Sequence, residues 1–237
     1  MKRVGLLLTF MVIGNSALAA DMPPPVAPLR YDWTGFYVGG NLGAAVGSSS
    51  FSDSLIPPSS FSSSSISSFI GGGQLGLNYE FGGGIVVGAE AMFDWLSNTP
   101  TNFTASNLRA GTAIGTINNR WITTVTGKLG YAWDRLLVYG KGGGAWIGTD
   151  NSLTVGATPA GVSVNSGSQG WTAGVGVEWA FAPKWSARAE YDFIGLQNQS
   201  FTVSGVPATP FAGDRFAVNN RNVQMITAGL NYKLGAW

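Results

Sequence analysis

The chain has 237 residues, of which only 11% are charged, and its 13 Lys and Arg against 12 Asp and Glu give a formal net charge of +1. Soluble surfaces usually carry roughly a quarter to a third charged residues, so this composition argues against an ordinary soluble domain. The lack of a basic excess gives no reason to expect nucleic-acid binding. With no histidine and no cysteine, the chain has no disulfides, no thiolate metal site and no Ser-His or Cys-His catalytic pair.

The N-terminal segment has the three parts of a secretory signal peptide. Lys2 and Arg3 come first, an apolar run follows over residues 4–13, and a small-residue motif ends the segment. The apolar run is too short to cross a bilayer as a helix. We therefore predict that the signal peptide comprises residues 1–19, with cleavage after Ala20 as the alternative. Its removal takes away two cations and leaves a net charge of −1.

A proline-rich lead, residues 20–32, comes next. Proline has no N–H to contribute to a sheet, so we expect this lead to lie extended in the periplasm. From residue 33 to residue 237 the chain reads as one β domain of eight segments in which apolar and polar residues alternate. The predicted strands are 34–46, 69–81, 85–96, 118–133, 136–148, 169–181, 185–196 and 222–234.

The connections between these strands are alternately short and long. The short ones are 82–84, 134–135 and 182–184, and the long ones, with no predicted structure of their own, are 47–68, 97–117, 149–168 and 197–221. Such long loops are uncommon in compact soluble domains, whereas outer-membrane barrels have short periplasmic turns and long extracellular loops. No later segment is apolar enough for a transmembrane helix, so we predict an all-β fold, an eight-stranded antiparallel transmembrane β-barrel.

Each predicted strand has an apolar face without charges, which we assign to lipid, and we assign the opposite face to the barrel interior. An eight-stranded barrel is just wide enough inside for side chains, so the interior charges should pair with one another. The register of the turn at 182–184 sets Glu178 opposite Arg188, which predicts one such pair. The predicted interior charge network comprises Glu80, Glu90, Asp94, Arg120, Lys128, Lys141, Glu178, Arg188, Glu190, Asp192 and Lys233.

The apolar faces tend to begin and end with aromatic residues, which favour the two membrane–water interfaces. We predict two aromatic girdles: Phe81, Trp133, Trp179, Trp185 and Tyr232 near the short turns, and Trp95, Trp121, Trp146 and Trp171 near the long loops. The alternative is a soluble sandwich or a lipocalin-like lipid carrier, in which the apolar face would turn inward. Recovery of the protein in the soluble periplasm would favour that alternative.

Three motifs resemble those of a known family. They are "WTGFYVGGNLG" at 33–43, "RAEYDF" at 188–193 and "AGLNYKL" at 228–234, and they are similar to motifs of the RopB-type outer-membrane immunogenic proteins of alphaproteobacteria. The resemblance covers nearly the whole mature chain. It implies an eight-stranded barrel related in architecture to the OmpA transmembrane domain, with roles in envelope integrity and in contact with the host or the environment. Some members of that family are porin-like.

The C-terminus departs from the pattern of such barrels, which usually end on an aromatic residue that the assembly machinery reads. Here Leu234 takes that place and the chain continues to Trp237. Two interpretations follow: Trp237 is the assembly signal, or it trails the last strand without that role.

We expect a structural and surface-interaction protein of the cell outer membrane, with a narrow, weakly selective porin-like channel as the alternative. The expected partners are outer-membrane lipid and lipopolysaccharide, the barrel assembly machinery, and any surface ligand of the loops 47–68, 97–117, 149–168 and 197–221. The Ser-rich first loop suits either such a ligand or simple solvation. We expect no enzyme activity, no cofactor, no metal and no nucleic acid.

Overall fold

The computed structural model describes residues 30–53, 64–97, 101–107, 111–155, 158–165, 168–202 and 215–235. Side chains are described over 30–48, 67–97, 120–148, 168–198 and 221–235. The predicted signal peptide, residues 20–29 of the lead, parts of all four long connections and Trp237 lie outside these ranges. Within them, no helix is both long enough and apolar enough to cross a membrane.

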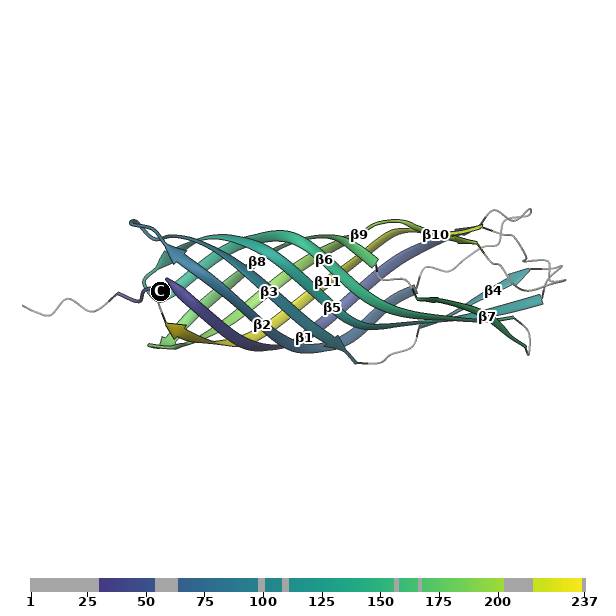
Figure 1. Cartoon of the computed structure of the whole chain (residues 1–237), viewed down its shortest axis with the longest axis horizontal. Helices are drawn as coiled ribbons and strands as arrows, with labels where there is room; N and C mark the ends of the chain where they lie inside the picture. The colour runs from purple at the N-terminus through teal and green to yellow at the C-terminus, as the bar shows by residue number, and fades with distance from the viewer. Residues whose placement is uncertain are drawn as a thin grey trace, which may run out of the picture.

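Eight long antiparallel strands close into a barrel, as the sequence predicts (Figure 1). They are β1 (Gly35–Asp53), β2 (Ser64–Glu80), β3 (Ile85–Leu96), β5 (Gly111–Trp133), β6 (Leu136–Val155), β8 (Ser168–Ala182), β9 (Trp185–Leu196) and β11 (Arg215–Gly235). Each of these strands pairs with the next one along the chain, and β11 pairs with β1 to close the ring.

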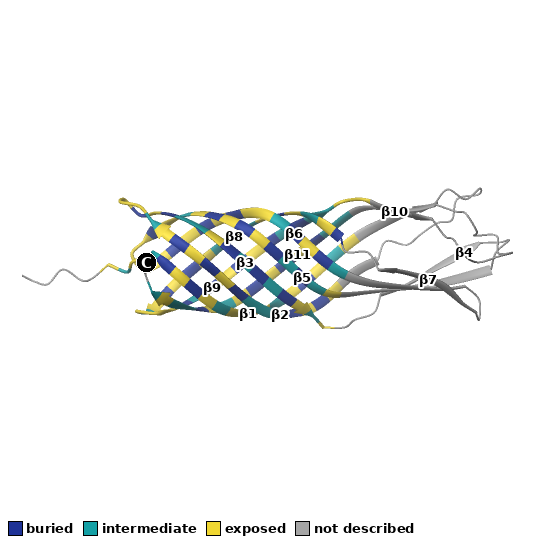
Figure 2. Ribbon diagram, in the orientation of Figure 1, coloured by how far each residue is buried: buried dark blue, intermediate teal, exposed yellow. Residues whose placement is uncertain are grey.

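The side chains of each strand alternate between two environments, which is why these segments form strands. Buried and exposed residues alternate along the described part of the wall in Figure 2. In β9, for example, Arg188, Glu190 and Asp192 are buried, whereas Ala189 and Tyr191 are exposed. The exposed face of this strand is the apolar one, as a lipid-facing surface requires, so its charged face lies inside the barrel.

The strands run further toward the long connections than the sequence predicts. β1 ends at Asp53 and not at residue 46, and β2 begins at Ser64 and not at residue 69. Three further strands lie within the long connections: β4 (Thr101–Asn107), β7 (Thr158–Asn165) and β10 (Gln199–Thr202). The expectation of unstructured connections was therefore wrong in part. Beyond the bilayer, backbone pairing alone satisfies a strand, so no apolar face marks it in the sequence.

The short turns lie at the opposite end of the barrel from the long connections (Figure 1). We call these the short-turn end and the long-loop end; in outer-membrane barrels they face the periplasm and the cell exterior. Asp134 begins the turn between β5 and β6 with a φ of 53°, a left-handed conformation that aspartate tolerates. Gly83 and Gly84 have φ of 97° and 91° in the turn between β2 and β3, where a side chain would be strained.

Aromatic side chains lie on the outer face near both ends of the barrel. All nine predicted girdle residues are exposed or partly exposed. Girdle rings contact other aromatic rings near both ends: Trp185 contacts Tyr232 near the short turns, and Trp95 contacts Phe93 near the long loops. Tryptophan and tyrosine suit this position because their rings satisfy both the apolar and the aqueous side of the interface.

The barrel wall consists of two similar halves, one from β1 to β5 and the other from β6 to β11. The same row of residues crosses three strands in each half: Tyr37, Gly76 and Glu90 across β1, β2 and β3, and Tyr139, Gly176 and Glu190 across β6, β8 and β9. A Cβ on Gly76 would lie 2.4 Å from Tyr37 Oη, and one on Gly176 would lie 2.6 Å from Tyr139 Cζ. Each tyrosine therefore lies over a glycine and reaches the glutamate beyond it.

Candidate functional site

Eight charged side chains are buried inside the described part of the barrel, five acids and three bases. They are Glu90, Asp94, Glu178, Glu190, Asp192, Lys128, Lys141 and Arg188, and each is at most 6% exposed. All eight are among the predicted interior charges. Ion pairs join six of them into a cluster that we call the charge belt, made of Glu90, Lys128, Lys141, Arg188, Glu190 and Asp192.

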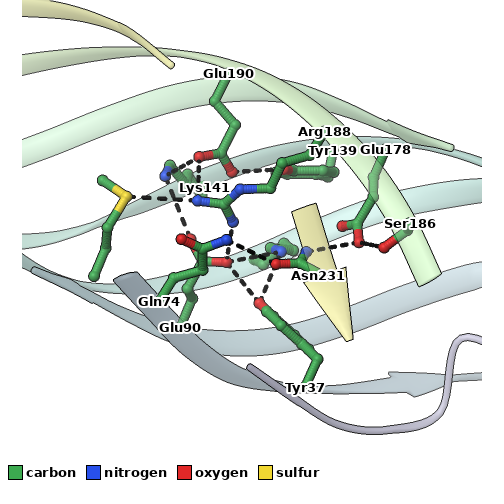
Figure 3. A network of polar contacts seen from close by, with 12 residues as sticks. Tyr37, Gln74, Glu90, Tyr139, Lys141, Glu178, Ser186, Arg188, Glu190 and Asn231 are labelled. Atoms are coloured by element: carbon green, nitrogen blue, oxygen red, sulfur yellow. Dashed lines mark hydrogen bonds and ion pairs between the residues drawn. The ribbon is translucent and has the colours of Figure 1, made fainter. Parts of the chain in front are cut away.

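Arg188 lies at the centre of the charge belt (Figure 3). Its Nη1 is 2.5 Å from Oε2 of Glu90 on β3, and its Nη2 is 2.9 Å from Oε2 of Glu190 on its own strand. Nη2 also lies 3.5 Å from Sδ of Met92. Because guanidinium offers several donors in a fixed plane, one arginine can bridge the equivalent glutamates of both halves.

Two lysines neutralise the remaining charge of the belt. Lys141 Nζ is 3.5 Å from Glu90, 3.0 Å from Glu190 and 3.1 Å from Asp192. Lys128 Nζ is 3.4 Å from Oε2 of Glu90. Glu90 therefore meets three cations and Glu190 meets two, so both glutamates are paired with buried bases.

The tyrosines of the two rows complete the belt with hydrogen bonds. Tyr37 Oη donates to Glu90 at 2.6 Å, and Tyr139 Oη donates to Glu190 at 2.5 Å. Lys128 Nζ donates to Tyr37 Oη at 3.0 Å and lies 4.3 Å from the ring centroid of Tyr139. Lys128 therefore contacts the tyrosines of both halves, just as Arg188 contacts both glutamates.

Three amide side chains form a second polar structure, which we call the amide chain. Asn41 Nδ2 donates to Gln74 Oε1 at 2.9 Å, Gln74 Nε2 donates to Asn231 Oδ1 at 2.8 Å, and Asn231 Nδ2 donates to Glu178 Oε1 at 2.8 Å. Ser186 Oγ donates to the same oxygen of Glu178. Every bond points from Asn41 toward Glu178, so the chain ends on a carboxylate, which accepts hydrogen bonds strongly.

The predicted register of β8 and β9 is confirmed, because Glu178 is paired with Arg188 along the backbone. The ion pair predicted from that register was wrong. The Arg188 guanidinium contacts Glu90 and Glu190, whereas Glu178 accepts hydrogen bonds from neutral side chains. A long side chain that points into a narrow barrel reaches strands well beyond its neighbour, so adjacency in the register does not decide the partner.

Two predicted members of the network lie at the short-turn end, outside the charge belt. Glu80 pairs with Arg30 of the lead at 2.8 Å, and Lys233 pairs with Asp32 of the lead at 3.7 Å. The prediction that they belong to the interior network was wrong, because it left out residues 30–32 of the lead, which lie at this end and supply their partners.

Arg120 and Asp94 also depart from the predicted network. Arg120 is exposed at the long-loop end, where a β-bulge between Asn119 and Trp121 interrupts the alternation of β5. Its assignment to the interior was therefore wrong. Asp94 is fully buried, but neither of its carboxyl oxygens has a hydrogen-bond partner in the described part of the barrel.

Apolar side chains fill the barrel on both sides of these polar groups, a feature that the sequence reasoning missed. The long-loop layer comprises Ala45, Ile70, Met92, Ile122, Ala145, Ile147, Ile194, Val223 and Met225, from every barrel strand except β8. The short-turn layer comprises Trp33, Val86, Ala132, Leu137, Tyr139 and Ala180. The detectable signal was a change from polar to apolar residues at the inward positions near both strand ends.

Trp33 closes the short-turn end. Its side chain is 4% exposed, its Nε1 donates to the carbonyl oxygen of Asp134 at 2.9 Å, and its backbone N–H donates to Glu80 at 3.0 Å. The backbone N–H of Tyr31 donates to Asp134 Oδ1 at 2.8 Å. The left-handed turn at Asp134 therefore holds the end of the lead inside the barrel mouth, where Trp33 packs into the short-turn layer.

The polar interior is suited to bracing and closing the barrel. Among the described residues, no group of three or more His, Cys, Asp or Glu side chains is placed to hold a metal ion. The belt carboxylates are engaged by bases and tyrosines, and every one of these contacts except the pair of Arg188 with Glu190 joins two different strands across the interior.

The sequence matches the family described as the outer membrane protein beta-barrel domain over residues 6–233. It is 31% identical over 249 residues to the 31 kDa outer-membrane immunogenic proteins of Brucella melitensis biotype 1 and Brucella suis biovar 1, a match that covers 98% of this chain and 100% of each relative. The structure is similar in fold to OprG from Pseudomonas aeruginosa, with a TM-score of 0.53, 14% identity, and coverage of 86% of this chain and 98% of that one. The predicted resemblance and the predicted location are thereby confirmed: the chain belongs to the outer membrane β-barrel protein family and is a protein of the outer membrane.

Proposed function

We propose that this protein is a closed barrel with a structural role in the outer membrane and that it holds its long connections at the cell surface. The observation that carries this proposal is the filled interior, in which the charge belt lies between the long-loop layer and the short-turn layer. A general diffusion pore needs a wider barrel, typically of about sixteen to eighteen strands.

The charge belt supports closure on energetic grounds. For a solute to pass, Arg188 would have to leave Glu90 or Glu190, which are its partners at 2.5 and 2.9 Å. Removing one partner from a buried ion pair typically costs about 3–5 kcal/mol, because the remaining charge stays buried without compensation. Such an opening would be rare at equilibrium.

Planar-bilayer conductance of the refolded protein tests closure. We expect no channel steps from the wild-type barrel, whose fold is checked on the same sample by a heat-dependent gel shift. A matched pair of variants keeps the result informative. Trp33→Ala combined with Met225→Ala thins both apolar layers and should introduce small steps, whereas Leu129→Ala on the lipid face should not. Large, stable steps from the wild type would contradict the proposal.

The surface role draws support from the curated relatives, whose name describes them as immunogenic. We extend that property to this chain and propose that the connections 47–68, 97–117, 149–168 and 197–221 are the parts that antibodies and surface ligands meet. An epitope tag inserted between residues 54 and 63 should bind its antibody on intact cells. The same tag inserted at 82–84 should bind only after the outer membrane is permeabilised, and the opposite pattern would overturn the proposed orientation.

The second candidate is a narrow, weakly selective porin-like channel. It is favoured by the continuous polar interior between the two layers, where the amide chain runs beside the charge belt. Small solutes would then pass when the side chains of both layers move aside. Reproducible small steps from the wild type that disappear when the long-loop layer is enlarged by Ala145→Leu would favour this candidate.

The remaining partners follow from the outer surface. We propose that lipid and lipopolysaccharide cover the apolar outer face, and that the barrel assembly machinery inserts the chain. Deletion of Trp237 followed by measurement of barrel insertion tests whether that residue is the assembly signal. Normal insertion would show that it trails the last strand without this role.

A further inference from the structure

Asp94 differs from the other buried acids in the surroundings of its carboxyl group. Its side chain is 0% exposed, and neither oxygen accepts a hydrogen bond from a described residue. It also forms no ion pair within 4.0 Å in the described part of the barrel, in contrast to the acids of the charge belt. An ionised carboxylate is strongly disfavoured in such a place, because burial removes its water and nothing replaces it.

Asn41, which faces this carboxyl, has a buried oxygen that also lacks a partner among the described residues. Asp94 lies over Gly72 of β2, where a Cβ would be 2.4 Å from Asp94 Oδ1. Across Gly72 on β1 is Asn41, whose amide lies close enough to interact with the carboxyl group. Asn41 Nδ2 donates to Gln74, and Asn41 Oδ1 is a buried acceptor without a donor. One proton on Asp94 would remove the uncompensated charge and give Asn41 Oδ1 a donor.

The charges around Asp94 do not compensate the negative charge that it would carry without that proton. Those that act on it through space are Arg188 and Asp192 of β9 and Lys141 of β6. Both cations already bind other acids of the charge belt, and Asp192 carries a charge of the same sign. With five buried acids against three buried bases, the described interior has a surplus of negative charge.

The described residues that pair with Asp94 or face it across the sheet have no titratable side chains. The residues paired with it are Gly72 of β2 and Ile122 of β5, and Asn41 faces it from β1. Ile122 belongs to the long-loop layer, as does Met92, which lies two residues before Asp94 on the same face of β3. The carboxyl group is therefore set against the apolar layer that closes the long-loop end.

We propose that Asp94 and Asn41 form a proton-binding site, in which Asp94 is a neutral carboxylic acid that donates its O–H to Asn41 Oδ1. The proton extends the amide chain, which then runs in one direction from Asp94 through Asn41 to Glu178. Loss of the proton puts a negative charge against the long-loop layer. Closure of that end therefore depends on pH and weakens as the pH rises.

The linkage to folding has a definite sign. In the unfolded chain an aspartate ionises near pH 4, so above that pH folding takes up a proton at this site for as long as the folded site keeps it. The contribution of Asp94 to stability is complete below that pH and is lost as the pH rises. While the folded site keeps its proton and the unfolded one does not, this group lowers the folding equilibrium constant about tenfold for each pH unit.

Infrared spectroscopy of the refolded full barrel at mildly acidic pH tests the site. The C=O stretching band of a protonated carboxylic acid should be present in the wild type and absent in Asp94→Asn, which has nearly the same shape. Asp192→Asn is the matched control, since Asp192 pairs with Lys141, and it should keep the band. Asn41→Ala should keep the band but move it to higher frequency, because the acceptor of the O–H is lost.

A second readout is the pH dependence of urea unfolding. Asp94→Asn should flatten the dependence by the tenfold per unit that one proton accounts for, over the pH range above 4 in which the wild type still shows the band. A wild-type spectrum without the band, or a band that survives in Asp94→Asn, would overturn the proposal. The frequency shift in Asn41→Ala tests the site even if Asp94→Asn folds poorly, and an unshifted band there would also overturn it.

Discussion

The two halves of the barrel have the same framework but different charges. Residues 71–96 of the first half align with 171–196 of the second without a gap, and the tyrosine, glycine and glutamate rows coincide. Within this stretch, the first half has Asn78, Gly88 and Met92 where the second has Glu178, Arg188 and Asp192.

This difference shows how a repeated framework accommodates a single charge network. Arg188 neutralises Glu190 of its own half and Glu90 of the other half, and its counterpart in the first half is Gly88. Because side chains fill the interior of an eight-stranded barrel, one central guanidinium serves both glutamates. The glutamate is therefore repeated in both halves, whereas the arginine that pairs with both glutamates occurs in only one of them.

Replacing the central cation should have the largest effect. Arg188→Met leaves Glu90 and Glu190 without their shortest ion pairs, so we expect the free energy of unfolding to fall by about 3–5 kcal/mol. Urea unfolding of the refolded barrel measures this change. Lys184→Met, at an exposed turn, is the control and should change little. A loss as small as that of the control would mean that the two lysines suffice for both glutamates.

The two tyrosines should differ in importance. Tyr37→Phe and Tyr139→Phe each remove a hydrogen bond to a charged glutamate, which typically contributes about 1.5–3 kcal/mol. The loss should be greater for Tyr37, because its oxygen also accepts a hydrogen bond from Lys128. Parallel urea titrations of the two variants give the ranking. A greater loss for Tyr139→Phe would contradict the assigned role of Lys128.

Substitution of the glycine in either tyrosine–glycine row should cost a similar amount of stability. Gly76→Ala and Gly176→Ala each force a methyl group against a tyrosine ring, and overpacking of this kind typically costs about 1–3 kcal/mol. Gly82→Ala is the matched control, because no atom lies within 4 Å of a Cβ at that position. Thermal unfolding measures both losses of stability. If one glycine tolerates the methyl group and the other does not, the two tyrosine–glycine rows do not contribute equally to stability.

The smallest expected effect concerns the short-turn end. Burial, with the negative charges of Glu178 and Asp32, raises the pKa of Tyr31 to about 12. The stabilisation linked to the protonated Tyr31 is complete below the ordinary tyrosine pKa of about 10 and is lost as the pH rises through about 12. The ionisation of Tyr31 is measured as the pH-dependent tyrosinate absorbance of the wild type minus that of Tyr31→Phe. Glu178→Gln should lower its midpoint, whereas Asn78→Asp on the first half should leave it unchanged.

The barrel and the inward position of most charges could be predicted from the sequence, because a period of two assigns each residue to one face of a strand. The contacts of Glu90 and Arg188 could not, since partners inside a barrel come from strands that are far apart in the chain. Arg120 was misassigned because one bulge changes the alternation locally. The burial of Trp33 depends on the hydrogen bonds of Tyr31 and Trp33 to Asp134, which no periodicity in the sequence reveals.

The bond between Gln74 and Asn231 has a consequence for assembly. It passes over Gly39 of β1, and so joins β2 to β11 across the seam where the first and last strands meet. An open, curved sheet with all other local pairings intact cannot contain this bond, since β11 has not yet reached β1. The bond can therefore form only once the barrel has closed. To open the seam between β1 and β11, the protein must break this side-chain hydrogen bond as well as the backbone hydrogen bonds between the two strands.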